Sequence, residues 1–222
     1  MSVNGLIVAS EAARRCGDEA YTRITRPDWL DFLNSVQRDI STRIPCVEYE
    51  SYASTQANDE RLMLPADLVQ IRFVRYSDQP GTVEYADLGE LPFDEWRERT
   101  NGMYPLDNIT DYCARLGFID LVGRPTTTIA DAVQLGYFGL AADLTDLTTQ
   151  SITLPDMLHD YLVDGMVILG KRKDKRFDEA AALEGVWRSR ESEWMSRASD
   201  RARDRRTSLR PKSLRRPTSG MV

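Results

Sequence analysis

Residues 25–45 read TRPDWLDFLNSVQRDISTRIP and predict one helix. Thr25 stands two residues before Pro27, the arrangement of an N-cap followed by a proline in the first turn. Five apolar side chains recur at spacings of four and three, so they fall on one helical face. They are Trp29, Leu33, Val36, Ile40 and Ile44. Pro45 cannot continue a helix, and we expect the helix to end there.

A second helix is expected before this segment. Its apolar stripe is short, and Gly17 follows it as a C-cap residue. The stripe consists of Leu6, Ile7, Ala9, Ala13 and Cys16.

Helical periodicity returns near residue 153. Thr153 before Leu154-Pro155-Asp156 is typical of a helix N-terminus. Gly170 and the cations after it predict the C-terminus, because positive charge there opposes the macrodipole. A last helix is expected from about Phe177. Its stripe holds Ala180, Leu183, Trp187 and Trp194.

Between these helices, residues 46 to about 142 change to the alternation of period two that is typical of half-exposed strands. Proline and glycine pairs separate the alternating runs. The expected strands are 47–52, 62–64, 69–76, 83–85, 112–116, 118–122, 127–129 and 133–140, with a short helix at 93–99.

The order of elements predicts an α+β fold within one large domain or one domain with an insert. We expect a mainly helical bundle formed by the N- and C-terminal helices, an inserted antiparallel β region that emerges from one end of it, and an extended basic C-terminal arm. The expected boundaries are 1–45 and 151–196 for the two halves of the bundle, 46–150 for the insert and 197–222 for the arm.

Charge is distributed very unevenly along the chain. Residues 197–216 hold nine Lys or Arg and two Asp, a net charge of +7. The other residues hold 20 of the 29 cations and 33 of the 35 carboxylates, a net charge of −13. An acidic body with a basic terminus that contains Pro and Ser favours a terminus that binds something else.

No enzyme signature competes with this interpretation. The sequence lacks nucleophile-elbow, zinc-protease, P-loop and dinucleotide-binding motifs. His159, the only histidine, is expected to be a polar residue facing the surface. Glu48 and Glu50 share a strand face and are read as solvated carboxylates, although a catalytic pair is the alternative. We therefore expect no catalytic residues, no cofactor and no metal.

Two further features bear on the environment of the protein. Cys16, Cys46 and Cys113 are far apart and odd in number, so buried free thiols are expected. No apolar run reaches about 18 residues and the start has no cationic leader, so we expect a protein that stays in the cytoplasm where it is made, without membrane contact.

Three interpretations of the basic terminus remain open. It could be a solubilising end, it could bind nucleic-acid phosphates without sequence preference, or it could become ordered against an acidic cleft of a protein partner. The acidic body would repel DNA, which favours the protein partner. The cations of 171–176 are expected to cap a helix and occupy a solvated loop.

The layout resembles the head-to-tail adaptor (connector, or head-completion) proteins of tailed bacteriophages, over about residues 20–196. Four segments carry the resemblance, mainly through their order. They are the helix at 27–40, the strand end LMLPADL at 62–68, the strand GYF at 136–138 and SITLP at 151–155.

This resemblance implies a structural virion protein, assembled in the host bacterial cytoplasm. Such adaptors form a homo-oligomeric ring, usually of twelve copies, that docks under the portal protein and meets the tail or the next head-completion protein. Double-stranded DNA passes through the channel without specific binding. The implied portal-docking residues on the arm are Arg203, Arg205, Arg206, Arg210, Lys212, Arg215 and Arg216.

The alternatives within and beyond this class are a tail-terminator or gatekeeper protein, and a nucleic-acid-binding packaging protein that uses the basic terminus on DNA.

Overall fold

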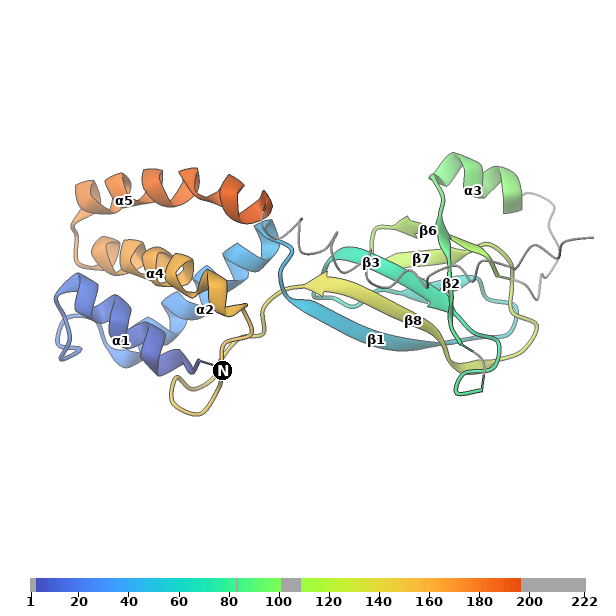
Figure 1. Cartoon of the computed structure of the whole chain (residues 1–222), viewed down its shortest axis with the longest axis horizontal. Helices are drawn as coiled ribbons and strands as arrows, with labels where there is room; N and C mark the ends of the chain where they lie inside the picture. The colour runs from blue at the N-terminus through green and yellow to red at the C-terminus, as the bar shows by residue number, and fades with distance from the viewer. Residues whose placement is uncertain (1–2, 83, 101–108, 197–222) are drawn as a thin grey trace, which may run out of the picture.

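A computed structural model describes residues 3–82, 84–100 and 109–196. It has a helical part at one end and a β part at the other, joined by a narrow waist (Figure 1). The predicted arm and its seven cations lie outside the described residues. The mixed α+β character expected from the sequence is confirmed, with five α-helices and two sheets in the described ranges.

Two capped helices open the helical part. α1 (Gly5–Cys16) begins at Asn4, whose side chain accepts from the Ile7 amide, and ends at Gly17 in the left-handed conformation, φ 69°. α2 (Arg26–Arg43) begins at a capping box formed by Thr25 and Asp28. Both helices therefore begin and end close to where their cap residues predict.

The C-terminal helices depart from the prediction at two residues. A 3₁₀ turn, η1 (Asp156–Leu158), precedes α4 (His159–Lys173), so Thr153 is not the N-cap of this helix. The helix also continues through Gly170 and ends at Lys173. A Cβ at Gly170 would lie 2.9 Å from Cys16 Sγ and 2.9 Å from Trp29 Cη2. Gly170 therefore lies within α4, where the lack of a side chain lets the helix pack closely against Cys16 and Trp29, and it is not the C-cap.

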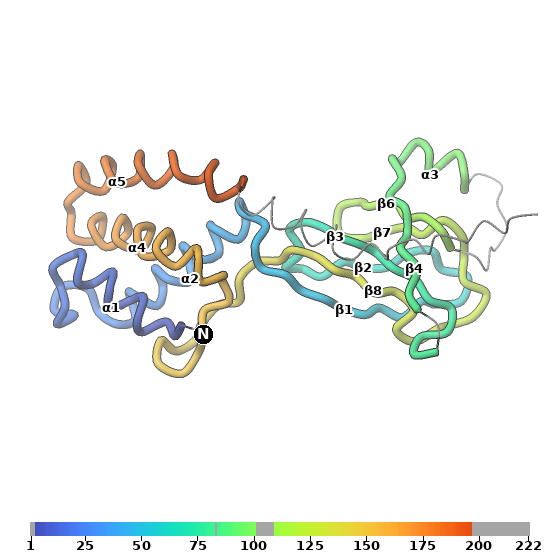
Figure 2. Tube along the Cα trace, in the orientation of Figure 1, coloured from blue at the N-terminus to red at the C-terminus, as the bar shows by residue number. Residues whose placement is uncertain are grey.

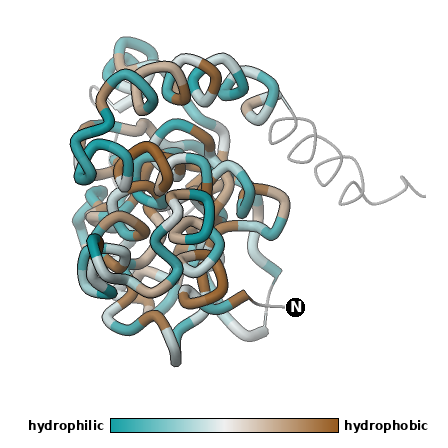
Figure 3. The backbone as a smooth tube through the Cα atoms, turned by 90° about the vertical axis from the view of Figure 1, so that its left-hand side faces the viewer, coloured by the Kyte–Doolittle hydropathy of each residue, from teal (hydrophilic) through white to brown (hydrophobic). Residues whose placement is uncertain are grey.

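α5 (Phe177–Ser189) follows after a short turn, and residues 191–196 are again helical. It lies along the outside of α4 (Figure 1). The view onto this end of the molecule shows both hydrophobic and hydrophilic positions along the outermost helix (Figure 3). Within the described ranges no helix is both long enough and apolar enough to cross a membrane.

The β part consists of two four-stranded sheets. The first has the order β1-β8-β3-β4 and the second the order β2-β7-β6-β5. Pairing is antiparallel except for the two-residue parallel pair β5–β6. The bounds are β1 Glu48–Thr55, β2 Arg61–Met63, β3 Leu68–Tyr76, β4 Ala86–Asp87, β5 Gly89–Glu90, β6 Asp111–Arg115, β7 Phe118–Leu121 and β8 Ile129–Gly139, with helix α3 at Phe93–Thr100.

Two strand predictions were wrong. Residues 84–85 are not in a strand, and residue 83 lies outside the described ranges. The strands expected at 127–129 and 133–140 are a single strand, β8. Asp131, φ 53°, looked like a break, but it lies within β8 opposite the register shift between Ala53 and Thr55. A β-bulge therefore lets β8 continue through Asp131, a residue that would otherwise indicate a turn.

Each part of the molecule has its own hydrophobic core. The helical core gathers side chains from α1, α2, α4 and α5, with Trp29, Leu33 and Met166 fully buried. The β core lies between the sheets and includes Leu121 and Val133. Segments from both ends of the chain thus share one core, while the middle of the chain forms the other.

The waist is formed by neighbouring strands. β1 enters the β part directly after α2, and β8 returns the chain to the helical part (Figure 2). The Gly139 amide donates to the Val47 carbonyl at 3.0 Å, and the Tyr49 hydroxyl donates to the Leu140 carbonyl at 3.1 Å. The returning chain, residues 141–152, then lies against the start of α1, where the Ile152 amide donates to Val3.

Candidate interaction surfaces

The described chain ends at an anchored point just before the predicted arm. Trp194 is buried, and its ring lies 6.3 Å from the ring of Tyr161. Glu191 pairs with Arg43 at the end of α2, N–O 3.2 Å. The last described residues, 191–196, are therefore held against α2 and α4.

Trp187 is the large buried side chain of α5 that packs against α4. The Trp187 ring stacks on Tyr161 with centroids 4.6 Å apart, and its Nε1 donates to the Tyr161 carbonyl at 2.8 Å. Gly165 of α4 makes room for this contact, because a Cβ there would lie 3.2 Å from the Trp187 ring and 2.5 Å from Val36. Burial raises the pKa of Tyr161 to about 12, so the hydroxyl stays neutral.

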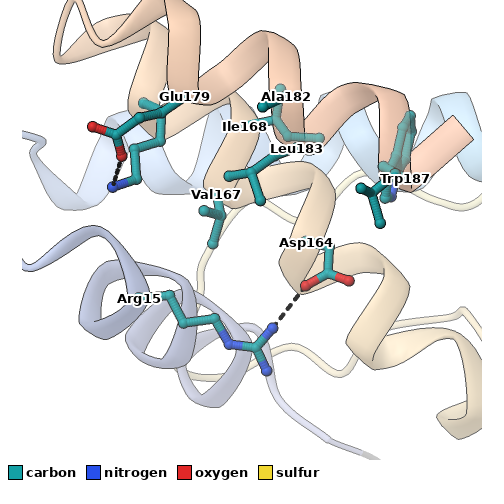
Figure 4. Close-up of a pocket in the computed structure, with 10 residues that line it drawn as sticks. Arg15, Asp164, Val167, Ile168, Glu179, Ala182, Leu183 and Trp187 are labelled. Atoms are coloured by element: carbon teal, nitrogen blue, oxygen red, sulfur yellow. Dashed lines mark hydrogen bonds and ion pairs between the residues drawn. The ribbon is translucent and has the colours of Figure 1, made fainter.

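An apolar groove runs along α5 on the side of α1. Its volume is about 530 Å³, and we call it the α5 groove (Figure 4). The apolar lining consists of Val167, Ile168, Ala182, Leu183, Val186 and Trp187. Leu183 is 41% exposed and Val186 is 59% exposed, so α5 presents large apolar side chains to solvent.

Ion pairs border this groove at both ends. Arg15 of α1 donates to Asp164 of α4 at 2.7 Å, and Lys171 donates to Glu179 at 3.0 Å (Figure 4). Hydrogen bonds from Lys171 and Arg176 lower the pKa of Glu179, so it remains charged. An apolar floor with a charged border is the composition of a protein-binding surface.

Sequence reasoning located this surface only in part. The predicted stripe of the last helix is confirmed for Ala180, Trp187 and Trp194, which are buried, although Trp194 lies in the helical stretch 191–196 after α5. Leu183 belongs to the exposed side. The spacing of three between Leu183 and Val186 indicates a second apolar line beside the buried one. That line was the missed signal.

The other residues considered in the sequence have ordinary environments. Glu48 and Glu50 do share the outer face of β1; Glu48 pairs with Arg72, and Glu50 accepts from Tyr52 and Gln134. His159 is not surface-facing as predicted, since its side chain is 14% exposed and its Nε2 lies 3.1 Å from the Leu154 carbonyl.

The cations at the α4–α5 turn cap the helix end, but they form ion pairs where a solvated loop was expected. Lys173 pairs with Asp28 at 3.3 Å, and Arg172 pairs with Glu184. This basic stretch is therefore largely neutralised within the helical part.

The three cysteines are free. Cys16 and Cys113 are buried as expected, whereas Cys46 is only half-buried. Burial raises the pKa of the Cys46 thiol to about 12, so it stays protonated. Across the described ranges, no three His, Cys, Asp or Glu side chains are grouped so that they could hold a metal ion.

Residues 5–216 match the family model described as SU10 adaptor protein. This match spans both helical segments, the β part and most of the basic terminus. No curated protein matches the chain.

Proposed function

The chain belongs to the SU10 adaptor protein family of phage structural proteins, and from this premise we propose that it forms a ring that joins the capsid to the tail. The family implies a virion component that interacts with head and tail components. In our proposal the ring, of twelve copies, docks under the portal protein, leaves a channel for DNA and is assembled in the bacterial cytoplasm. It contacts the tail or the next head-completion protein on its other side.

The charge distribution is the observation that supports docking through the arm. Residues 197–216 carry a net charge of +7, and the rest of the chain carries −13. Arginine side chains form two-pronged hydrogen bonds with carboxylates, so an arm rich in arginine suits an acidic cleft of the portal. The proposed docking residues are Arg203, Arg205, Arg206, Arg210, Lys212, Arg215 and Arg216.

We assign a separate role to each part of the chain. We assign residues 1–45 and 151–196 to a helical bundle that packs around the ring, residues 46–150 to an inserted β region and residues 197–222 to the docking arm. The α5 groove supports the first assignment, because its exposed apolar side chains would be covered by a neighbouring copy. A ring repeats each weak arm contact in every copy, so modest contacts give a stable joint.

A truncation tests the role of the arm. Ending the chain after Met195 should abolish binding to purified portal while ring formation, measured by light scattering, is unchanged. A matched full-length variant with all seven docking cations replaced by Gln distinguishes the effect of losing the positive charge from the effect of shortening the chain. If the truncated chain instead loses binding to double-stranded DNA that weakens steeply with salt, the packaging-protein alternative is correct. Unchanged portal binding would refute arm docking.

The α5 groove can be tested separately from the arm. Val186→Glu places a carboxylate among apolar side chains and should reduce the particle mass of the purified protein to that of small species. Ala181→Glu is the matched control, since Ala181 is exposed on the same helix and does not line the groove. Equal particle masses for the two variants would exclude the groove from the subunit contact.

A further inference from the structure

The turn between β6 and β7 presents a large apolar side chain to solvent. Leu116 and Gly117 form this turn, and Gly117 has φ 83°, a conformation that glycine adopts readily. The turn therefore requires the glycine, but nothing in it requires a leucine at the other position, where Gly, Asn and Asp are the usual hairpin residues. Leu116 is nevertheless 99% exposed.

Met63 of β2 lies beside this turn. It is paired with Phe118, the first residue after the turn, and the Leu64 amide donates to the Gly117 carbonyl at 3.0 Å. Met63 is 76% exposed, so Met63 and Leu116 are the two most exposed large apolar side chains of the described residues. We call this pair the hairpin knob. Exposed apolar residues are ordinary when they are scattered singly, whereas two adjacent ones favour an interaction site.

The strands around the knob hold it in a fixed position. The guanidinium carbon of Arg61 lies 4.1 Å from the centroid of the Phe118 ring, and Arg61 pairs with Asp120 at 3.0 Å. Arg115, the residue before the turn, pairs with the same buried carboxylate at 2.9 Å. A knob that is already ordered loses little conformational freedom when it binds, and this favours binding.

The α5 groove complements the knob in size and chemistry. Its 530 Å³ equal the volume of about 18 water molecules at about 30 Å³ each, so two apolar side chains can enter it. Its floor is apolar, with Val167 and Ile168 below the exposed Leu183. A second hollow of about 490 Å³ along α2 is lined by polar and charged side chains, among them Asp31 and Arg38. Burial of a leucine is therefore more favourable in the α5 groove than along α2.

Knob and groove lie in different parts of one molecule. β2, β6 and β7 belong to the β part and α5 belongs to the helical part, on the two sides of the waist (Figure 1). A contact between knob and groove therefore joins two copies. Such a contact uses two different surfaces of the same chain, so it repeats head to tail from copy to copy and gives a ring when the rotation closes.

We propose that the hairpin knob of one copy inserts into the α5 groove of the next copy. This inference rests on the proposed ring and names the contact that the α5 groove makes within it. Leu116 then packs against Leu183 and Val186, so exposed apolar surface of both copies is removed from water at once.

A pair of opposite charges tests this contact directly. Leu116→Lys should raise the dissociation constant between copies at least tenfold, because an ammonium group would enter an apolar groove. Combining it with Val186→Glu should recover association relative to either single variant, since the introduced ammonium and carboxylate then meet across the contact. The concentration dependence of the particle mass measures each dissociation constant.

The matched control combines Leu116→Lys with Ala181→Glu, and it should not recover association, because Ala181 is exposed on the same helix and does not line the groove. Far-UV circular dichroism verifies that each variant retains the fold, which is expected because Leu116 and Val186 are both exposed. Equal association of the two combinations would overturn the inference.

Chemical cross-linking provides a second readout. Leu116→Cys combined with Leu183→Cys should give, with a short bis-maleimide reagent on the full chain, a ladder of covalent multimers on a denaturing gel. Each single variant and the parental chain, which supplies the background of the native thiols, should remain monomeric on the gel.

The outcomes distinguish this inference from the proposed ring. A cross-linked dimer of Leu116→Cys alone would show that two knobs meet about a two-fold axis, and it would overturn the inference. Rings of parental mass formed by Leu116→Lys, or rings without a covalent ladder, would also overturn it while leaving the proposed ring intact. A parental chain that is monomeric at every concentration would refute both.

Discussion

Replacement of Gly170 by alanine tests the packing of α4 against α1 and α2. A Cβ at this position would lie 2.9 Å from Cys16 Sγ, 2.9 Å from Trp29 Cη2 and 3.4 Å from Ile24 Cδ1. Trp29 is fully buried and Cys16 is 5% exposed, so neither can move into solvent. Overpacking of this kind costs about 1–3 kcal/mol. Alanine in a helix interior recovers about 1 kcal/mol relative to glycine.

Gly185→Ala is a control that removes the propensity gain from the comparison. Gly185 lies inside α5, and a Cβ there has no atom within 4 Å. Both substitutions gain the same helix propensity, so the difference between the two variants measures overpacking alone and should be about 1–3 kcal/mol. Gly185→Ala should be more stable than the parent by about 1 kcal/mol.

Urea unfolding followed by tryptophan fluorescence at low protein concentration measures both free energies. The dependence of the free energy of unfolding on urea should be unchanged, because the surface exposed on unfolding is the same. If Gly170→Ala were as stable as Gly185→Ala, Gly170 would have room for a side chain, and the close approach of α4 to Trp29 would be refuted.

Two other substitutions probe single polar groups. Burial by itself would raise the pKa of the Asp18 carboxyl, but hydrogen bonds from the Ile24 amide and neighbouring groups outweigh it, so the pKa is lowered. The stabilisation by the ionised carboxylate is therefore present at neutral pH. It is lost as the pH falls from 3.8 through the lowered value. Asp18→Asn should lower the free energy of unfolding at pH 7 by about 1–3 kcal/mol and flatten its acid dependence, and a parallel pH curve for parent and variant would contradict this. Arg115→Gln removes an ion pair with the buried Asp120 and the cation that stacks on two aromatic rings of α3, so amide exchange in α3 should accelerate. The exposed pair made by Arg124 is the control, and Arg124→Gln should change stability by less than about 1 kcal/mol; equal exchange rates in the two variants would refute the role of Arg115.

The sequence predicted elements whose signals are local. α2 was identified because its cap, its proline and its apolar spacing all lie within residues 25–45. The single strand β8 was missed because its continuity depends on the bulge opposite Thr55, which belongs to a distant strand. The role of Gly170 was missed for the same reason, since Trp29 excludes a side chain there only after the chain has folded.

The candidate surfaces also differ in whether local sequence signals predict them. A basic terminus can be counted from composition, whereas the α5 groove depends on which side of α5 faces α4. The stacking of Trp187 on Tyr161 fixes that orientation and leaves Leu183 outside. The order of strands in the two sheets could not be predicted either, because the alternation within one strand does not indicate which strand lies beside it.

The helical core, to which both ends of the chain contribute, can form only late in translation. α1 and α2 leave the ribosome early, but their apolar faces are covered by α4, which is translated after the whole β part. At typical elongation rates this delay is on the order of ten seconds. During that interval the early helices are candidates for chaperone binding, and a chain cut short within the β part never covers them. Only a chain that has been translated through α4 can therefore bury the apolar faces of α1 and α2.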